Sequence, residues 1–174
     1  MKRLITTAAF VLAVPTLASA QNADHQYRGQ GYFFFGLGTR TSPGSSRLGV
    51  IEHLGFGGEG FLYKGFGVGV EAGYVHWGPY ADQAWIGSGD ASYHFRRSAP
   101  RGGVDPFVLI GVTGYFPASE GRGAPAGNFG GGVNIWLRER AALRLEVRDH
   151  VNPDNANGWP GTHYISFRIG MTFR

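Results

Sequence analysis

The last twelve residues of the chain, HYISFRIGMTFR, alternate in polarity along their whole length. Every second residue is apolar: Ile165, Phe167, Ile169, Met171 and Phe173. The residues between them are polar, small or amphipathic. A period of two predicts a β-strand that has one apolar and one polar face. Because similar segments recur along the chain, this pattern constrains the fold more than any other feature.

The first twenty residues have the layout of a signal peptide. A positively charged start at Lys2 and Arg3 precedes an apolar run, and small residues end the segment at Ala20. The apolar run is too short to cross a membrane as a helix, which takes about 20 residues. We therefore expect residues 1–20 to be a cleaved signal peptide for export, and residues 21–174 to form one domain.

Charge and cysteine content exclude several classes of protein. The 16 basic residues exceed the 12 acidic ones only slightly and do not cluster as a nucleic-acid surface requires. The chain has no cysteine, so no disulfide can stabilise the exported domain. The glycine-rich run from Gly65 to Gly69 lies within strand alternation and precedes no helix, unlike a phosphate-binding loop. The Asp and Asn residues after His150 have turn chemistry without a calcium-ligand spacing. We expect no nucleic-acid partner, no cofactor and no metal.

The chain combines 30 glycines with 25 aromatic residues (4 Trp, 8 Tyr and 13 Phe). Glycine is depleted in ordinary strands because it contributes no side chain to packing. The number of aromatic residues argues against disorder. A strongly curved, closed sheet accommodates many glycines together with many aromatic residues, since glycine relieves crowding inside it and aromatic residues cover its surface.

Eight segments have strand character, and no segment of the mature chain has a helical period. The connections after the second and sixth segments are only a few residues long, whereas those after the first, fifth and seventh are longer. We expect these longer loops, Thr39–Arg47, Pro117–Gly127 and Asn152–Thr162, to lie on one side. The eight segments cover residues 27–39, 47–63, 66–77, 84–95, 105–116, 128–137, 141–151 and 163–174.

This pattern resembles the superfamily of small bacterial outer-membrane β-barrels. The resemblance covers essentially the whole mature chain and implies an all-β, eight-stranded, antiparallel up-and-down transmembrane barrel after a cleaved signal peptide. It implies a monomer in the cell outer membrane, in contact with lipid and lipopolysaccharide, with a structural or surface-interaction role and no enzymatic activity. It also implies that the barrel-assembly machinery reads Phe173 as the C-terminal aromatic signal, although Arg174 follows it.

The seventh segment carries charges at alternate positions. Arg144, Glu146 and Arg148 share a face with His150, and an arginine at the membrane midplane costs about 2–4 kcal/mol on the lipid side. These charges are therefore expected to point into the barrel. Partners on the polar faces of other segments would be Glu59, Glu71 and Arg168. Since eight strands leave an interior barely wide enough for side chains, we expect the network to plug the lumen; a gated pore is the alternative.

A second, local resemblance surrounds His150 and Asn152. Lipid A deacylases, which are small outer-membrane barrels, carry a His-x-Ser-Asn motif in which serine is the nucleophile. Here Asn152 replaces the serine and Pro153 the asparagine. An amide cannot act as that nucleophile, so a deacylase-like enzyme would be inactive. The plainer interpretation of His150 and Asn152 is a rim site beside a turn-rich loop.

Two further expectations depend on the direction of the strand faces. In a soluble, lipocalin-like periplasmic barrel with an apolar ligand, the apolar faces would point inward and the charges outward.

In the transmembrane barrel, Glu52 and Asp149 fall on the apolar phase near the outer ends, at headgroup level. There the larger aromatic residues are expected to anchor at the interfaces: Trp77, Tyr80, Trp85, Tyr115, Trp136 and Tyr164.

The small residues before Gln21 generate a testable prediction about processing. Intact mass spectrometry of the protein purified from membranes is expected to give an N-terminus at Gln21, within a residue or two, because Ala18 and Ala20 suit signal peptidase. Retention of Met1 in the membrane form would contradict it.

Overall fold

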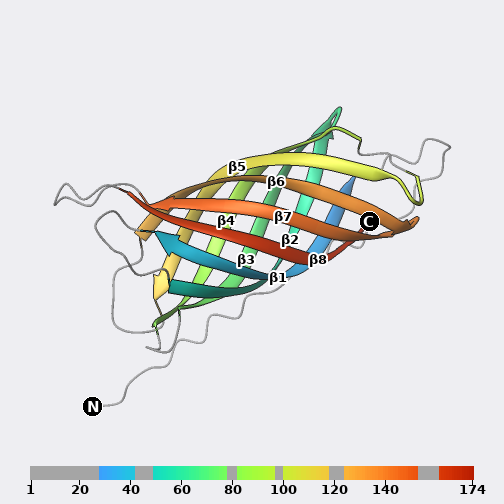
Figure 1. Cartoon of the computed structure of the whole chain (residues 1–174). Coiled ribbons are helices and arrows are strands. Elements are labelled where there is room, and N and C mark those ends of the chain that lie inside the picture. Colours follow the sequence, from blue (N-terminus) through green and yellow to red (C-terminus); the bar gives the residue numbers. More distant parts are fainter. Residues whose placement is uncertain (1–27, 42–48, 78–81, 97–99, 118–123, 153–160) are drawn as a thin grey trace, which may run out of the picture.

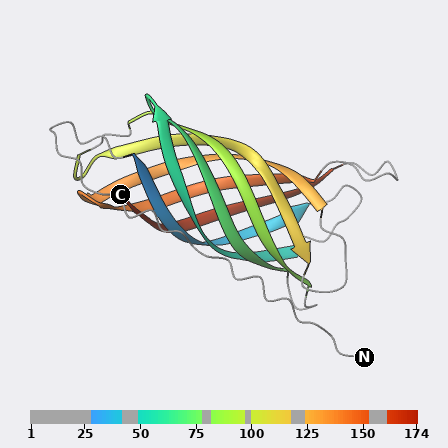
Figure 2. The same cartoon turned by 180° about the vertical axis from the view of Figure 1, so that it is seen from behind.

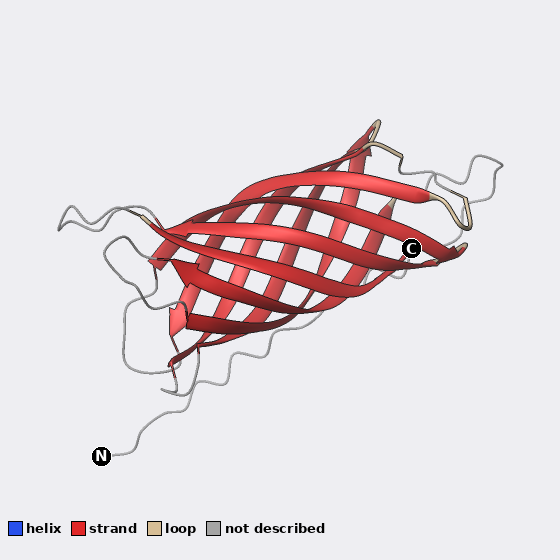
Figure 3. Ribbon diagram, viewed as in Figure 1, coloured by secondary structure: helices blue, strands red, loops and turns tan. Residues whose placement is uncertain are grey.

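Eight β-strands make up the described part of the molecule (Figures 1 and 3). The structure, a computed structural model, describes residues 28–41, 49–77, 82–96, 100–117, 124–152 and 161–174. The predicted signal peptide lies outside these residues. The expected segments agree with the strands except for a few residues at their ends. The strands are β1 (Gly29–Thr41), β2 (Gly49–Tyr63), β3 (Phe66–Trp77), β4 (Asp82–His94), β5 (Val104–Pro117), β6 (Ala124–Arg138), β7 (Ala141–Asn152) and β8 (Thr162–Phe173).

The strands form a closed, up-and-down barrel. Each pairs antiparallel with the next along the chain, and β8 pairs with β1 to complete the ring (Figure 2). Two connections are two-residue turns, Lys64–Gly65 and Glu139–Arg140; the first has positive φ at both residues, 41° and 92°, which matches the strand twist. We call the end with these turns, the β4–β5 connection and the C-terminus the turn end, and the opposite end the loop end. No helix long and apolar enough to cross a membrane occurs among the described residues.

The two faces of the sheet have opposite polarity. On β8, Phe167 is 53% exposed, whereas its neighbour Arg168 is 1% exposed. All eight strands present large apolar side chains to the outside, and 18 of the described residues are polar or charged and buried. The predicted alternation is thus confirmed. The inverse assignment of a lipocalin-like barrel, with its apolar faces inward, is wrong for this fold. Outward apolar residues include Phe33, Leu54, Val70, Trp85, Ile110, Phe129 and Val147.

The structure resolves the faces of β5, which the sequence left open because apolar residues occupy both phases of this strand. Asp105, Phe107 and Thr113 are buried inside the barrel. Val108 and Ile110 face outward, at 49% and 66% exposure. The fifth strand therefore supplies a carboxylate to the interior that periodicity alone does not reveal.

The glycines of β2 make room for aromatic rings. The Gly57-Gly58 pair could also form a β-bulge that shifts the phase of the strand, but none forms there. The pairing register with β1 continues through these residues, and the irregularity lies between Phe61 and Tyr63, beside the turn. A Cβ at Gly57 would come within 2.6 Å of the Tyr32 ring. The phase of the strand therefore does not shift here, and the glycine relieves side-chain crowding while the strand stays regular.

Two of the aromatic residues expected at the membrane interfaces lie inside the barrel instead. Trp136 and Tyr164 are 1% and 4% exposed, and Trp77 and Tyr115 pack partly buried against an interior cluster. Only Trp85 of the described members is exposed on the outside, at 60%. These rings occupy positions of their strands whose side chains point inward. The alternation of the strand therefore determines where they lie, and the general preference of Trp and Tyr for interfaces does not. Tyr80 lies outside the described residues.

The closing strand generates a prediction about assembly. Phe173 is 47% exposed, and its ring stacks on Phe33 with centroids 6.1 Å apart. If Phe173 is the aromatic signal of the C-terminal strand, Phe173→Ala lowers the yield of folded, heat-modifiable barrel in cells, and deletion of Arg174 does not.

Phe33→Ala is the matched control, because it removes the same ring contact and leaves the C-terminal pattern intact. Semi-native gel electrophoresis of outer-membrane fractions measures the yield. Equal losses in the two alanine variants would mean that packing, not recognition, explains the effect.

Candidate functional site in the barrel interior

Ion pairs between β3, β7 and β8 occupy the middle of the barrel. Arg168 Nη1 lies 3.0 Å from Glu71 Oε1 and 3.2 Å from Glu146 Oε1. Arg148 Nε lies 2.7 Å from Glu146 Oε1, and its Nη2 lies 3.4 Å from Glu71 Oε2. Arg144 donates from Nε and Nη2 to Glu146 Oε2 at 2.9 and 2.7 Å. Glu146 therefore contacts three arginines, and all five residues are at most 4% exposed.

Strand geometry explains why these charges meet. Arg144, Glu146 and Arg148 occupy alternate positions of β7, so their side chains leave the same face of the strand. In the pairing of β7 with β8, Glu146 is directly opposite Arg168. A cross-strand pair of opposite charge is favourable at such a position. Glu71 reaches the group from β3, across the lumen.

Towards the turn end, a second network is centred on Glu59. Its carboxylate accepts hydrogen bonds from Gln30 Nε2 at 2.8 Å and from the Ser92 hydroxyl. His94 Nε2 lies 3.1 Å from Glu59 Oε2, and His94 Nδ1 lies 2.7 Å from Asp105 Oδ2. One imidazole thus connects two buried carboxylates. Glu59 lies inside the barrel as expected, but the ionisable side chain that contacts it is this histidine rather than an arginine.

Several interior residues were not singled out from the sequence. Asp90 Oδ2 accepts from Arg148 Nη1 at 3.0 Å, and Asp90 Oδ1 accepts from Asn128 Nδ2 at 3.0 Å. Asp90 and His94 sit on the polar phase of β4, so the alternation of that strand contains the signal for both. Asp105 lies at the start of β5, just before a run of apolar residues. This strand has no alternation of polar and apolar residues that would indicate the direction of the Asp105 side chain.

Aromatic rings enclose two of the arginines. The guanidinium carbon of Arg144 lies 4.4 Å from the centroid of Tyr32 and 4.0 Å from that of Phe107. The guanidinium carbon of Arg168 lies 4.4 Å from the centroid of Phe34. Cation–π contacts of this kind strengthen when water is excluded. The rings therefore fill space beside the ion pairs and also stabilise their positive charge.

Towards the loop end, the interior changes from charged to mainly apolar. Ile51, Val75, Ile86 and Tyr164 form a buried cluster. The ring of His150 stacks on that of Tyr164, with centroids 5.2 Å apart. This apolar and aromatic layer covers the central ion pairs from the loop side.

The structure places His150 inside the barrel, at 1% exposure. Asn152 ends β7 and pairs with Thr162 of β8. The two residues therefore do not form a catalytic pair at the lipid surface. The buried imidazole packs against the ring of Tyr164.

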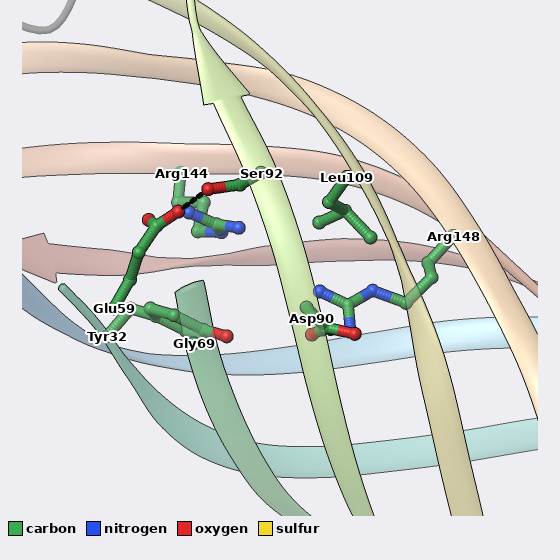
Figure 4. A pocket seen from close by; sticks show the side chains of 8 residues that line it. All are labelled: Tyr32, Glu59, Gly69, Asp90, Ser92, Leu109, Arg144 and Arg148. Atoms are coloured by element: carbon green, nitrogen blue, oxygen red, sulfur yellow. Dashed lines mark hydrogen bonds and ion pairs between the residues drawn. The ribbon is translucent and has the colours of Figure 1, made fainter. Parts of the chain in front are cut away.

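A small cavity separates the central network from the network around Glu59 (Figure 4). Its volume of ≈ 10 Å³ is about that of one water molecule. Figure 4 shows Arg144 beside Ser92 and Glu59, and Arg148 beside Asp90. Arg144 Nη1 has no hydrogen-bond partner among the described residues. The space suits a single bridging water and is far smaller than a pocket for an organic ligand. The cavity is lined by Tyr32, Glu59, Gly69, Asp90, Ser92, Leu109, Arg144 and Arg148.

Comparison with known proteins was informative at the level of structure. No family model matches the chain, and no curated protein matches its sequence. Neisserial surface protein A superposes with a TM-score of 0.60 at 11% identity, covering 84% of this chain and 97% of that chain. The attachment invasion locus protein Ail of Yersinia pestis gives 0.57 at 11% identity, with 83% and 96% covered. The outer membrane enzyme PagL gives 0.54 at 13% identity, with 80% and 97% covered.

The chain therefore has the fold of the small, eight-stranded outer-membrane β-barrels. The fold predicted from the sequence is confirmed. These identities establish the fold alone, and this fold carries different functions, one of the three structures being an enzyme.

The central network generates a prediction about stability. Breaking a buried ion pair typically costs about 3–5 kcal/mol, because a charge remains without its partner. Glu146→Gln leaves three arginines with one fewer counter-charge, and Arg148→Ala removes contacts to Glu71, Glu146 and Asp90. Both variants are expected to lower the urea midpoint of the barrel in lipid bilayers markedly.

Glu52→Gln is the matched control. Glu52 faces outward, with a side chain that is 61% exposed and 3.8 Å from His76, so its removal should change stability little. Unfolding is followed by tryptophan fluorescence or by heat modifiability on gels. Equal midpoints for wild type, Glu146→Gln and Arg148→Ala would place these charges in water rather than in a closed interior.

Proposed function

We propose that this chain is an integral protein of the bacterial outer membrane, with a structural or surface-interaction role and a lumen closed by its own side chains. The observation that carries the proposal is the polarity of the barrel: exposed apolar residues cover its outside on every strand, and charged residues fill its inside. Such a surface is stable in a hydrocarbon environment and unfavourable in water. The fold shared with solved outer-membrane barrels supports the same location.

Closure of the lumen rests on three successive layers of side chains. The network around Glu59 lies towards the turn end, the ion pairs around Glu146 lie in the middle, and the cluster around Tyr164 lies towards the loop end. The large members of each layer are buried, including Trp136, Phe107, Arg148 and Arg168 at 2% exposure or less. These layers leave no room for hydrated ions to pass, because the interior of an eight-stranded barrel is little wider than the space that side chains fill. We therefore favour a plug over the gated pore.

The loop end is the part of the molecule that we assign to the cell surface. Connections on the outer side are the longer ones in such barrels, and the loops between β1 and β2, β5 and β6, and β7 and β8 leave the barrel there. Most of their residues, 42–48, 118–123 and 153–160, lie outside the described residues. A surface partner would meet these loops. Lipid and lipopolysaccharide around the barrel, the assembly machinery and a monomeric state remain part of the proposal.

An enzyme acting on membrane lipid is the weaker candidate. Asn152 stands where the deacylase motif has its serine, and His150 points into the barrel, away from any lipid substrate. We therefore assign no catalytic residues.

The plug and the membrane location are tested together in planar lipid bilayers. Purified, folded wild-type barrel is expected to insert and to give little or no stable channel current, because side chains occupy the lumen. Insertion is verified independently by protease protection and heat modifiability in vesicles of the same lipid.

Two outcomes would contradict the proposal in different ways. A large, steady conductance from verified, inserted wild type would replace the plug by a pore. A barrel that stays monodisperse in buffer without detergent and does not enter bilayers would instead favour a soluble protein.

A further inference from the structure

Exposed cations surround the turn end of the barrel. The described residues outside the lumen at this end include six exposed cationic side chains, and every connection there, as well as the residue that precedes β1, contributes at least one. Glu139 is the one exposed acidic side chain among the described residues of this end. The six cations are Arg28, Lys64, Arg96, Arg101, Arg138 and Arg140.

These cations are not used by the fold. The ion pairs of the described residues all lie in the lumen or near the loop end, and none includes any of the six. Lys64 contacts the ring of its neighbour Tyr63, at 5.0 Å, which leaves its charge unneutralised. A set of like charges at one end raises the energy of the barrel by mutual repulsion unless an external anion compensates it.

The depth of the cations along the barrel indicates what that anion is. Exposed apolar side chains come directly before Lys64, Arg96 and Arg138 in the sequence: they are Tyr63, Phe95 and Leu137, at 63%, 58% and 50% exposure. These side chains end the apolar outer surface at the turn end. A cation one residue further lies at the level of lipid headgroups when the apolar surface is in hydrocarbon.

The two ends of the barrel differ in charge. Near the loop end, the described outward-facing carboxylates Glu52 and Asp149 pair with His76 and His163, at 3.8 and 2.7 Å. Arg40 is the exposed arginine of the described residues there. Among the described residues, exposed cations without an ion pair therefore concentrate at the turn end, with six there against Arg40 at the loop end.

We propose that the turn end is a binding surface for anionic phospholipid headgroups of the adjacent leaflet, with the six cations in contact with lipid phosphates. This rests on the proposed membrane location. Under that orientation, the turn end faces the periplasm and the lipids are those of the periplasmic leaflet. Basic residues at a membrane surface attract anionic lipid in this way, and the attraction fades with salt. Such contacts hold the barrel at a defined depth and orientation.

Spin-labelled lipids measure this preference directly. The folded barrel is reconstituted into phosphatidylcholine bilayers that contain a trace of spin-labelled phosphatidylglycerol or spin-labelled phosphatidylcholine. The motionally restricted fraction gives the relative association constant of the two lipids. Wild type is expected to prefer phosphatidylglycerol about fivefold, the factor for about one cation–headgroup contact per bound lipid. High salt should reduce the preference towards one.

The variant that tests the surface combines Lys64→Gln, Arg138→Gln and Arg140→Gln, which removes half of the six exposed charges and no described ion pair. Its preference is expected to fall at least twofold. Arg40→Gln, at the loop end, is the matched control and should keep the wild-type value. Heat modifiability confirms that each variant folds.

Equal lipid preference in wild type and the triple variant would overturn the proposal, as would no preference in inserted wild type. A triple variant that loses binding to purified cell-wall sacculi while keeping its lipid preference would reassign the surface to the cell wall and also overturn it. Failure of the wild-type barrel to enter bilayers at all would instead count against the proposed membrane location, so the two failures are distinguishable.

Discussion

The structure depends on the burial of charge inside a closed sheet. Glu146 accepts contacts from Arg144, Arg148 and Arg168, and Glu71 and Asp90 complete the charge pairing of the last two. Desolvating these groups is costly, and their mutual attraction compensates only if each keeps its partners. Because the partners come from β3, β4, β7 and β8, the network is complete only when the barrel has closed in one register. A slip of one residue would turn every charge of a strand to the outside of the barrel.

The two surfaces of the barrel therefore have separate tasks. Under the proposed membrane location, the outside interacts with lipid: apolar residues meet the hydrocarbon, and the exposed cations at the turn end meet headgroups. The inside joins the strands, with ion pairs in the middle and the apolar cluster around Tyr164 towards the loop end. An interior built in this way favours a rigid support for loops over a channel. Specific contacts of the protein would then involve its ends, where side chains and loops leave the barrel.

The predictability of the fold and of the interior differs for a physical reason. Successive side chains of a strand point to opposite faces, so polarity assigns Phe167 to the outside and Arg168 to the inside from the sequence alone. The same rule assigned Glu59, Glu71, Arg144, Glu146 and Arg148 to the inward face. The alternation rule could not be applied to β5, where apolar residues follow one another. The inward position of Asp105 was therefore not predicted. The general preference of aromatic residues for interfaces was misleading for Trp136 and Tyr164, which follow the phase of their strands.

The sequence by itself thus determined the class of fold, the number of strands and, on seven of the eight strands, the direction of the side chains, because these depend on local alternation. Only the tertiary structure decided which charges meet. Arg168 and Glu71 are 97 positions apart and come into contact because the closed barrel brings β3 and β8 face to face across the lumen. His94 links Glu59 to Asp105 for the same reason. Partner choice in a lumen depends on register and on the width of the barrel, which are properties of all eight strands together.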